Sequence, residues 1–121
     1  MTETVQDLSE LTLREVNSAL HRLEAGSVAV THPNGRHSVA AGLRTPLRVR
    51  VAGHCGYYAA GMNQLADVVI EGNAGVGVAE NMMSGSVRVR GNASQSAGAT
   101  AHGGLLVVEG DAAARWIWEM V

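Results

Sequence analysis

Short apolar runs, each ending in a glycine and a polar residue, recur along the second half of the chain. The four runs are Val49-Arg-Val-Ala-Gly53-His54, Val68-Val-Ile-Glu-Gly72-Asn73, Val87-Arg-Val-Arg-Gly91-Asn92 and Leu106-Val-Val-Glu-Gly110-Asp111. Successive glycines are 19 residues apart. A fixed short period of β-branched strands and turn glycines is typical of coils stacked into a solenoid.

Stacking these runs in register predicts which side chains face the interior and which face outward. The three inward columns are Val49, Val68, Val87 and Leu106; then Val51, Ile70, Val89 and Val108; then Cys55, Ala74, Ala93 and Ala112. Alternation along each strand sends two columns outward, namely Arg50, Val69, Arg88 and Val107, and Ala52, Glu71, Arg90 and Glu109. We expect Arg90 to lie between the carboxylates of Glu71 and Glu109 on the neighbouring coils. An exposed pair contributes only about 0.2–1 kcal/mol, so apolar stacking should dominate.

A polar column follows the glycines and consists of His54, Asn73, Asn92 and Asp111. Such residues tolerate turns and can bond to the equivalent residue one coil away, which predicts a structural ladder. Small residues fill the later part of each coil, so the cross-section should be narrow and hold no ligand-sized cavity. The predicted fold is all-β: a parallel β-solenoid with 19-residue coils, right-handed by the rule for parallel crossovers.

A helix is expected before the coils, where Thr12-Leu-Arg-Glu15 has the sequence of a capping box. Leu13, Val16, Leu20 and Leu23 share one helical face, and Gly26 is placed to end the helix. This helix is expected to cap the open end of the solenoid or to dock on a partner. The organisation is then an N-terminal helix and cap (1–27), a hairpin or irregular first coil around Pro33-Asn34-Gly35 (28–46), regular coils (47–114) and an atypical tail (115–121).

Composition supports one domain with close backbone packing. The chain has 121 residues, 46% of them apolar, a net charge of −2, 15 glycines and no phenylalanine. The near-neutral charge gives no electrostatic footprint for nucleic acid, and no apolar run is long enough to span a membrane. The acidic start lacks the pattern of a signal peptide and there is one cysteine, which predicts a cytoplasmic protein.

The stretch from Val68 to Glu80 resembles the start of a nucleotide site but lacks its residues. A dinucleotide fingerprint needs a third glycine where Glu80 stands, and a phosphate loop needs Lys and Ser or Thr where Val78 and Ala79 stand. No room remains for the crossover helix of a βαβ unit before the next strand. We therefore assign Gly72, Gly75 and Gly77 to the stacking of coils.

Several side chains are candidates for chemistry. His32 and His37 flank the Pro33 turn and His54 adjoins Cys55, but their spacing matches no metal-ligand pattern, so a structural role is favoured. Outward Glu71 and Glu109 are separated by Arg90, which argues against paired-carboxylate chemistry. An apolar group could serve either coil-edge packing or partner contact; it comprises Tyr57, Tyr58, Met62, Met82 and Met83. The sequence predicts no catalytic, cofactor-binding or metal-binding residue.

The glycine pattern resembles the GXGXG-type β-helix domain of glutamate synthases, and in particular its stand-alone, GlxC-like form, which is similar to a small subunit of N-methylglutamate synthases. The resemblance is carried by stretches from Gly35-Arg-His-Ser-Val-Ala-Ala-Gly42 to Gly110-Asp-Ala-Ala-Ala114. Its most specific parts are Val78-Ala-Glu-Asn-Met-Met-Ser-Gly85 and Gly91-Asn-Ala-Ser-Gln-Ser-Ala-Gly-Ala-Thr-Ala-His-Gly-Gly104. Members of this family continue for further coils, whereas here the pattern gives way to Arg115–Val121, so a shortened or shifted version with an improvised cap is expected.

The resemblance implies a scaffold subunit of an oxidoreductase complex that joins methylamine to a glutamate skeleton. Its implied partners are an amidotransferase-like subunit and an FMN-bearing synthase subunit. The resemblance places FMN, with an iron–sulfur cluster as a further option, on a partner subunit and no cofactor on this chain. Three alternatives stay open. They are a scaffold like the β-helix subunit of formylmethanofuran dehydrogenase, beside molybdenum or tungsten and iron–sulfur partners; a self-assembling MinC-like solenoid, associating through its ends; and a small enzyme on a β-helix.

Overall fold

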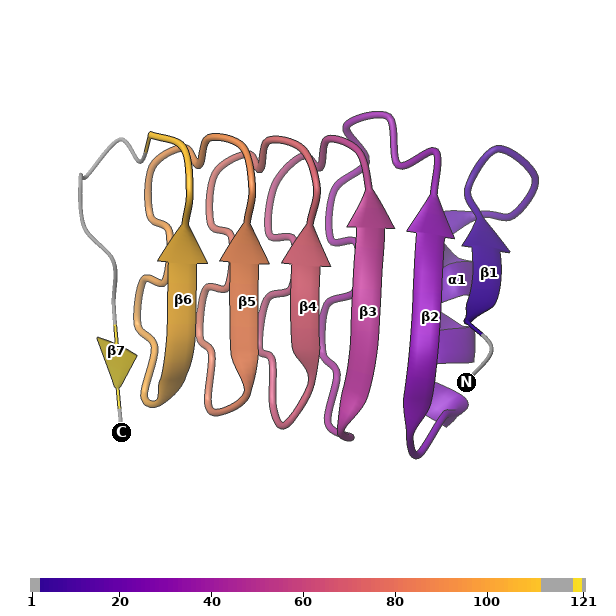
Figure 1. Cartoon of the computed structure of the whole chain (residues 1–121), viewed down its shortest axis with the longest axis horizontal. Helices are drawn as coiled ribbons and strands as arrows, with labels where there is room; N and C mark the ends of the chain where they lie inside the picture. The colour runs from indigo at the N-terminus through magenta and orange to yellow at the C-terminus, as the bar shows by residue number, and fades with distance from the viewer. Residues whose placement is uncertain (1–2, 112–118, 121) are drawn as a thin grey trace.

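The computed structural model describes residues 3–111 and 119–120. It is a parallel β-solenoid of about four turns with one short helix, as the sequence predicted (Figure 1). Among the described residues, seven strands form a single sheet in the order in which they occur along the chain. The elements are β1 (Thr4–Asp7), α1 (Leu13–Arg22), β2 (Gly26–Thr31), β3 (Leu47–Ala52), β4 (Asp67–Ile70), β5 (Ser86–Val89), β6 (Gly104–Val108) and β7 (Glu119–Met120). Strands β1 to β6 are parallel, and β7 pairs antiparallel with β6.

The register between strands β3 and β6 confirms the 19-residue period. Val49 pairs with Val68, Val68 with Val87, and Val87 with Leu106. Every member of the first two inward columns is at most 6% exposed. Cys55, Ala74 and Ala93 form the third column through parallel bridges and are equally buried, whereas Ala112 lies outside the described residues.

The first coil is irregular because it contains two residues more than the others. Strand β2 runs parallel to β3 with Val28 opposite Val49, an offset of 21 residues, so the segment between them is a coil and not a hairpin. After the turn the offset is 20, because Gly35 donates its N–H at 2.9 Å to the carbonyl of His54, 19 residues on, whereas the equivalent bond of the next coil, from Cys55 to the Asn73 carbonyl, spans 18 residues. One extra residue is accommodated around Pro33, which is buried against Gly53, and the other lies between Leu43 and strand β3, where the offset becomes 19.

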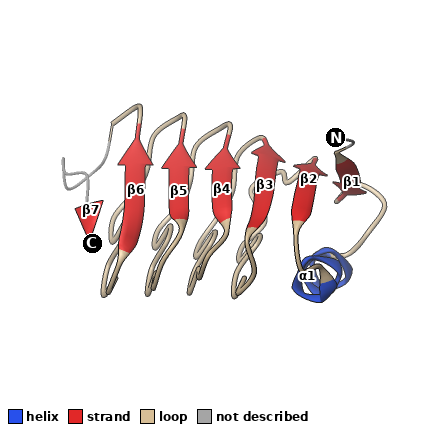
Figure 2. Ribbon diagram, turned by 60° about the horizontal axis from the view of Figure 1, so that its bottom comes forward, coloured by secondary structure: helices blue, strands red, loops and turns tan. Residues whose placement is uncertain are grey.

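Helix α1 closes the N-terminal end of the solenoid (Figure 2). Thr12 is its N-cap and forms the predicted capping box with Glu15, with bonds of 3.1 and 3.0 Å. Val16 and Leu20 are fully buried. Asn17 donates to the Ser38 carbonyl at 2.8 Å and accepts the Ala40 N–H at 2.9 Å, so a helix side chain provides the bonds that a preceding coil would make.

Two features at this end differ from the sequence-based expectation. The helix ends at Arg22, with Leu23 as its C-cap, and Gly26 instead begins strand β2. Strand β1 was not predicted at all, because Thr4–Asp7 contains one apolar residue and no clear alternation. It nevertheless extends the sheet, with Thr4 opposite Val28.

Two glycines of the nucleotide-like stretch, Gly72 and Gly75, lie where neighbouring coils approach closely. A Cβ at Gly72 would lie 2.7 Å from the carbonyl carbon of Gly53, and a Cβ at Gly75 would lie 2.8 Å from that of Gly56. Real side chains do not tolerate backbone contacts that short. Gly72 and Gly75 therefore permit coil stacking, as the sequence predicted, whereas Gly77 adopts a positive φ of 80° and a Cβ there would meet the Glu80 side chain of its own coil.

Candidate functional site

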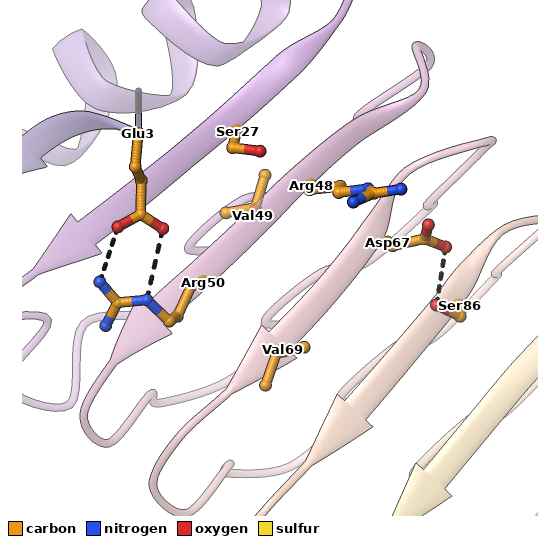
Figure 3. A pocket seen from close by; sticks show the side chains of 8 residues that line it. All are labelled: Glu3, Ser27, Arg48, Val49, Arg50, Asp67, Val69 and Ser86. Carbon is orange, nitrogen blue, oxygen red and sulfur yellow. Dashed lines mark hydrogen bonds and ion pairs between the residues drawn. The ribbon is translucent and has the colours of Figure 1, made fainter. Parts of the chain in front are cut away.

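A groove of about 500 Å³ lies on the outward face of the sheet (Figure 3). Its walls come from the start of the chain and from strands β2 to β5. The lining residues are Glu3, Ser27, Arg48, Val49, Arg50, Asp67, Val69 and Ser86. The groove is a shallow feature of a sheet surface, and it offers charged and hydroxyl groups over a partly apolar floor.

One side of the groove is a row of polar side chains in register on adjacent strands. Ser27 pairs with Arg48, Arg48 with Asp67, and Asp67 with Ser86. The Ser86 hydroxyl donates to Asp67 Oδ1 at 2.7 Å. Successive members of the set Arg48, Asp67 and Ser86 are 19 residues apart, so the repeat could have placed them in one column, but this column was not among those predicted from it.

On the other side of the groove, Arg50 links the start of the chain to strand β3 and the end of β4. Its guanidinium lies 2.9 Å from Glu3 Oε1 and 2.9 Å from Glu71 Oε1. The hydrogen bond from Arg50 lowers the pKa of Glu3, and the bonds to Glu3 and Glu71 raise the pKa of Arg50. All three side chains are 35–41% exposed, so solvent screens these ion pairs.

Arg90 lies in register between Glu71 and Glu109, as predicted, but it forms an ion pair with neither carboxylate. Glu71 pairs with Arg50, and Glu109 pairs with Arg88 at 3.2 Å. Within the described part of the chain, Arg90 forms no ion pair. The pairs are diagonal because a long arginine side chain reaches the residue two positions further along the neighbouring strand.

Asp7, Ser9 and His32 form a cluster above the first coil. Asp7 Oδ1 accepts the Ser9 N–H at 2.9 Å and the Ser9 hydroxyl at 2.8 Å, and it lies 2.8 Å from His32 Nδ1. The Ser9 bonds, with a smaller effect of His32, lower the pKa of Asp7 to about 2. Serine and histidine both bond to the carboxylate and not to each other, so the cluster lacks the nucleophile–base contact of a catalytic triad.

His37 and His54 are used between coils. His37 Nδ1 accepts the Tyr57 N–H at 2.7 Å, and the two rings stack at 4.4 Å. His54 Nδ1 accepts the Asn73 N–H at 2.8 Å, which forms the first rung of the predicted polar ladder. The structure thus places the three candidate histidines in separate contacts, and among the described residues no three His, Cys, Asp or Glu groups come together as metal ligands would.

Cys55 faces the interior, as predicted. It is 5% exposed, and burial raises the pKa of its thiol to about 12. A thiol that stays protonated is a poor nucleophile and a poor metal ligand, so its environment favours a packing role.

The apolar group divides between the interior and the surface. Met82 is buried, and the hydroxyl of half-buried Tyr58 accepts a bond from Asn81 Nδ2 at 3.2 Å. In contrast, Tyr57, Met62 and Met83 are 59%, 48% and 47% exposed. Coil packing accounts for Met82, whereas partner contact stays a prediction for the three exposed side chains.

In the part of the chain that the structure describes, no helix has both the length and the apolar character needed to cross a bilayer.

Comparison with known proteins gives one informative similarity. The chain is similar to Protein GlxC of Rhizobium meliloti (strain 1021), with 52% identity over 63 residues. The matched segment makes up 49% of this chain and only 28% of GlxC. No protein-family model matches the chain, and no solved structure matches it. A GlxC-like relation is therefore supported for about half of the chain.

Proposed function

We propose that this chain is a non-catalytic β-solenoid scaffold subunit of a glutamate-synthase-like complex, of the type that acts in N-methylglutamate synthesis. The similarity to GlxC and the resemblance of the glycine repeat to GXGXG domains support the assignment. The β-solenoid fold agrees with it.

The observation that carries the proposal is how the candidate chemical groups are used. His37 and His54 accept backbone N–H groups of the next coil, and Cys55 is buried with a raised pKa. Side chains that could do chemistry thus hold the coils together, while the outward surface carries paired charges and exposed apolar groups suited to protein contact.

In this proposal the partners supply the reaction. An amidotransferase-like subunit releases ammonia from glutamine or supplies the equivalent amine, and a synthase subunit binds FMN. The solenoid keeps these subunits in fixed positions and binds no cofactor itself. The cytoplasm is the compartment in which such a complex would work.

Co-expression with amidotransferase-like and flavoprotein subunits from the same organism tests the proposal. The tagged full chain should bring down both partners, and the eluate should show a flavin absorbance spectrum. A Met83→Glu variant places a charge on an exposed apolar side chain and should weaken capture, whereas Arg14→Ala on the exposed side of α1 is the matched control. Molybdenum or tungsten with iron–sulfur partners, or a chain that elutes alone, would contradict the proposal.

A further inference from the structure

The outward face of the sheet is uncovered over strands β3 to β6, whereas on β2 the outward-facing Ala29 is buried. Helix α1 and the loops of the coils lie on the opposite side, and no described element crosses this face (Figures 1 and 2). Positive and negative side chains are present in equal number on it. They are Arg48, Arg50, Arg88 and Arg90, and Glu3, Asp67, Glu71 and Glu109. A partner whose charges complement this face must itself carry side chains of both signs, with a net charge close to zero.

Two neighbouring charged side chains on this face have no ion-pair partner among the described residues. Arg48 and Asp67 are directly opposite across strands β3 and β4, yet no ion pair joins them within the described chain. Asp67 Oδ1 accepts the Ser86 hydroxyl, which leaves Oδ2 free of described protein bonds. Figure 3 shows the two side chains at the rim of the groove with no bond between them. Both are exposed.

We propose that this face binds the same face of a second copy of the chain about a twofold axis, with Arg48 of each copy against Asp67 of the partner subunit. A twofold contact is self-complementary, so adjacent opposite charges on one face meet their complements on the other copy, and the pair forms twice. Half-buried Val69 and Val107 and the exposed Leu105 supply apolar contact between the sheets. The groove gives room for the incoming arginine. This inference does not depend on the scaffold proposal.

The size of the face sets the expected affinity. Four strands about 4.8 Å apart and only a few residues long make a smaller patch than the roughly 800 Å² per partner of a standard interface. The dimer should therefore be weak and reversible. Because its central contacts are ion pairs between exposed groups, it should also weaken as salt is added.

Sedimentation of the full 121-residue chain over a range of concentrations tests the dimer. The wild-type chain should show a monomer–dimer equilibrium. R48D and D67R should each raise the dissociation constant by about tenfold or more, because like charges then meet at both contacts. An equimolar mixture of R48D and D67R should dimerise again, since the two aspartates of the R48D copy then face the two arginines of the D67R copy. R14D, on the exposed surface of α1, is the matched charge control.

The melting curves of the variants show whether each is folded before its association is compared. Loss of dimer in both single variants with recovery in the mixture supports the proposal. A wild-type chain that stays monomeric at every concentration overturns it. A dimer that tolerates R48D and D67R, or a mixture that stays monomeric, overturns it equally.

Discussion

The side-chain oxygen of Asn73 accepts the backbone N–H of Asn92 at 2.8 Å, across one coil interface of the solenoid. The same bond recurs one coil earlier, from the Asn73 N–H to His54 Nδ1, and one coil later, from the Asp111 N–H to Asn92 Oδ1. Three rungs of equal length show that this column fixes the register of the coils outside the sheet.

Removing one rung should lower stability by a moderate amount. Asn73→Ala leaves the Asn92 N–H without its acceptor at a solvent-exposed position, so we expect a loss of about 0.5–1.5 kcal/mol in the free energy of unfolding. His54→Asn keeps an acceptor in the column and should cost less than Asn73→Ala. Urea denaturation measures both changes. Equal stability of Asn73→Ala and the wild-type chain would show that the ladder is incidental.

Close stacking at the glycine column should make Gly72 intolerant of a larger residue. Gly72→Val brings a branched side chain against the Gly53 carbonyl, where even a Cβ would lie at 2.7–2.8 Å. We expect a loss of about 1–3 kcal/mol or more, because the coils must separate. The neighbouring Glu71→Val, on the exposed face, should change stability much less. Thermal melts of the two variants make the comparison, and equal melting temperatures would contradict the glycine assignment.

Local bonds to Asp7 should make the N-terminal end sensitive to acid. The folded-state pKa of Asp7 is about 2, below its ordinary 3.8, because Ser9 donates two hydrogen bonds to it. A lowered pKa contributes stability that is present above about pH 4 and is lost as the pH falls towards about 2. Asp7→Asn should therefore reduce the loss of stability over that range, whereas Glu24→Gln serves as an exposed control. Denaturant midpoints at several pH values measure the difference, and identical acid profiles for Asp7→Asn and the wild-type chain would count against this role.

How far the sequence predicted the structure depended on periodicity. The 19-residue repeat determined which valines pair and which side chains are buried, since a register error of one residue would expose the whole inward column. It did not predict β1, whose few residues carry no repeat, or the link from Glu3 to Arg50, because nothing local joins positions so far apart. The partners of Arg50 and Arg88 were also missed, since column position does not determine which rotamer a long side chain adopts.

Cys55 should be protected while the chain is folded. The thiol is buried and its pKa is raised to about 12, so at about pH 8 hardly any thiolate is present to react. Disulfide reagents should label it slowly in buffer and rapidly in denaturant. Because the folded pKa exceeds the unfolded value of about 8.5, the stability that Cys55 contributes is complete below that pH and declines as the pH rises towards about 12. Cys55→Ala, which matches Ala74 and Ala93 in its column, should remove this alkaline decline. Rapid labelling of the folded chain would show that the third column is open.

The inward valine columns carry the most stringent test of the fold. Val89 is fully buried between Ile70 and Val108, so Val89→Asp would place a carboxylate in the apolar interior without a partner. The carboxylate must either stay charged at a cost of several kcal/mol or take up a proton. The free energy of unfolding of so small a coil stack is itself only marginal. We expect cooperative unfolding to be lost, as followed by circular dichroism during heating. Arg90→Asp, one residue along and outward, introduces the same side chain into solvent and should leave the transition cooperative. If both variants melt like the wild-type chain, the inward assignment of the column is wrong. If both variants lose the cooperative transition, aspartate is not tolerated at either position and the experiment does not distinguish inward from outward residues.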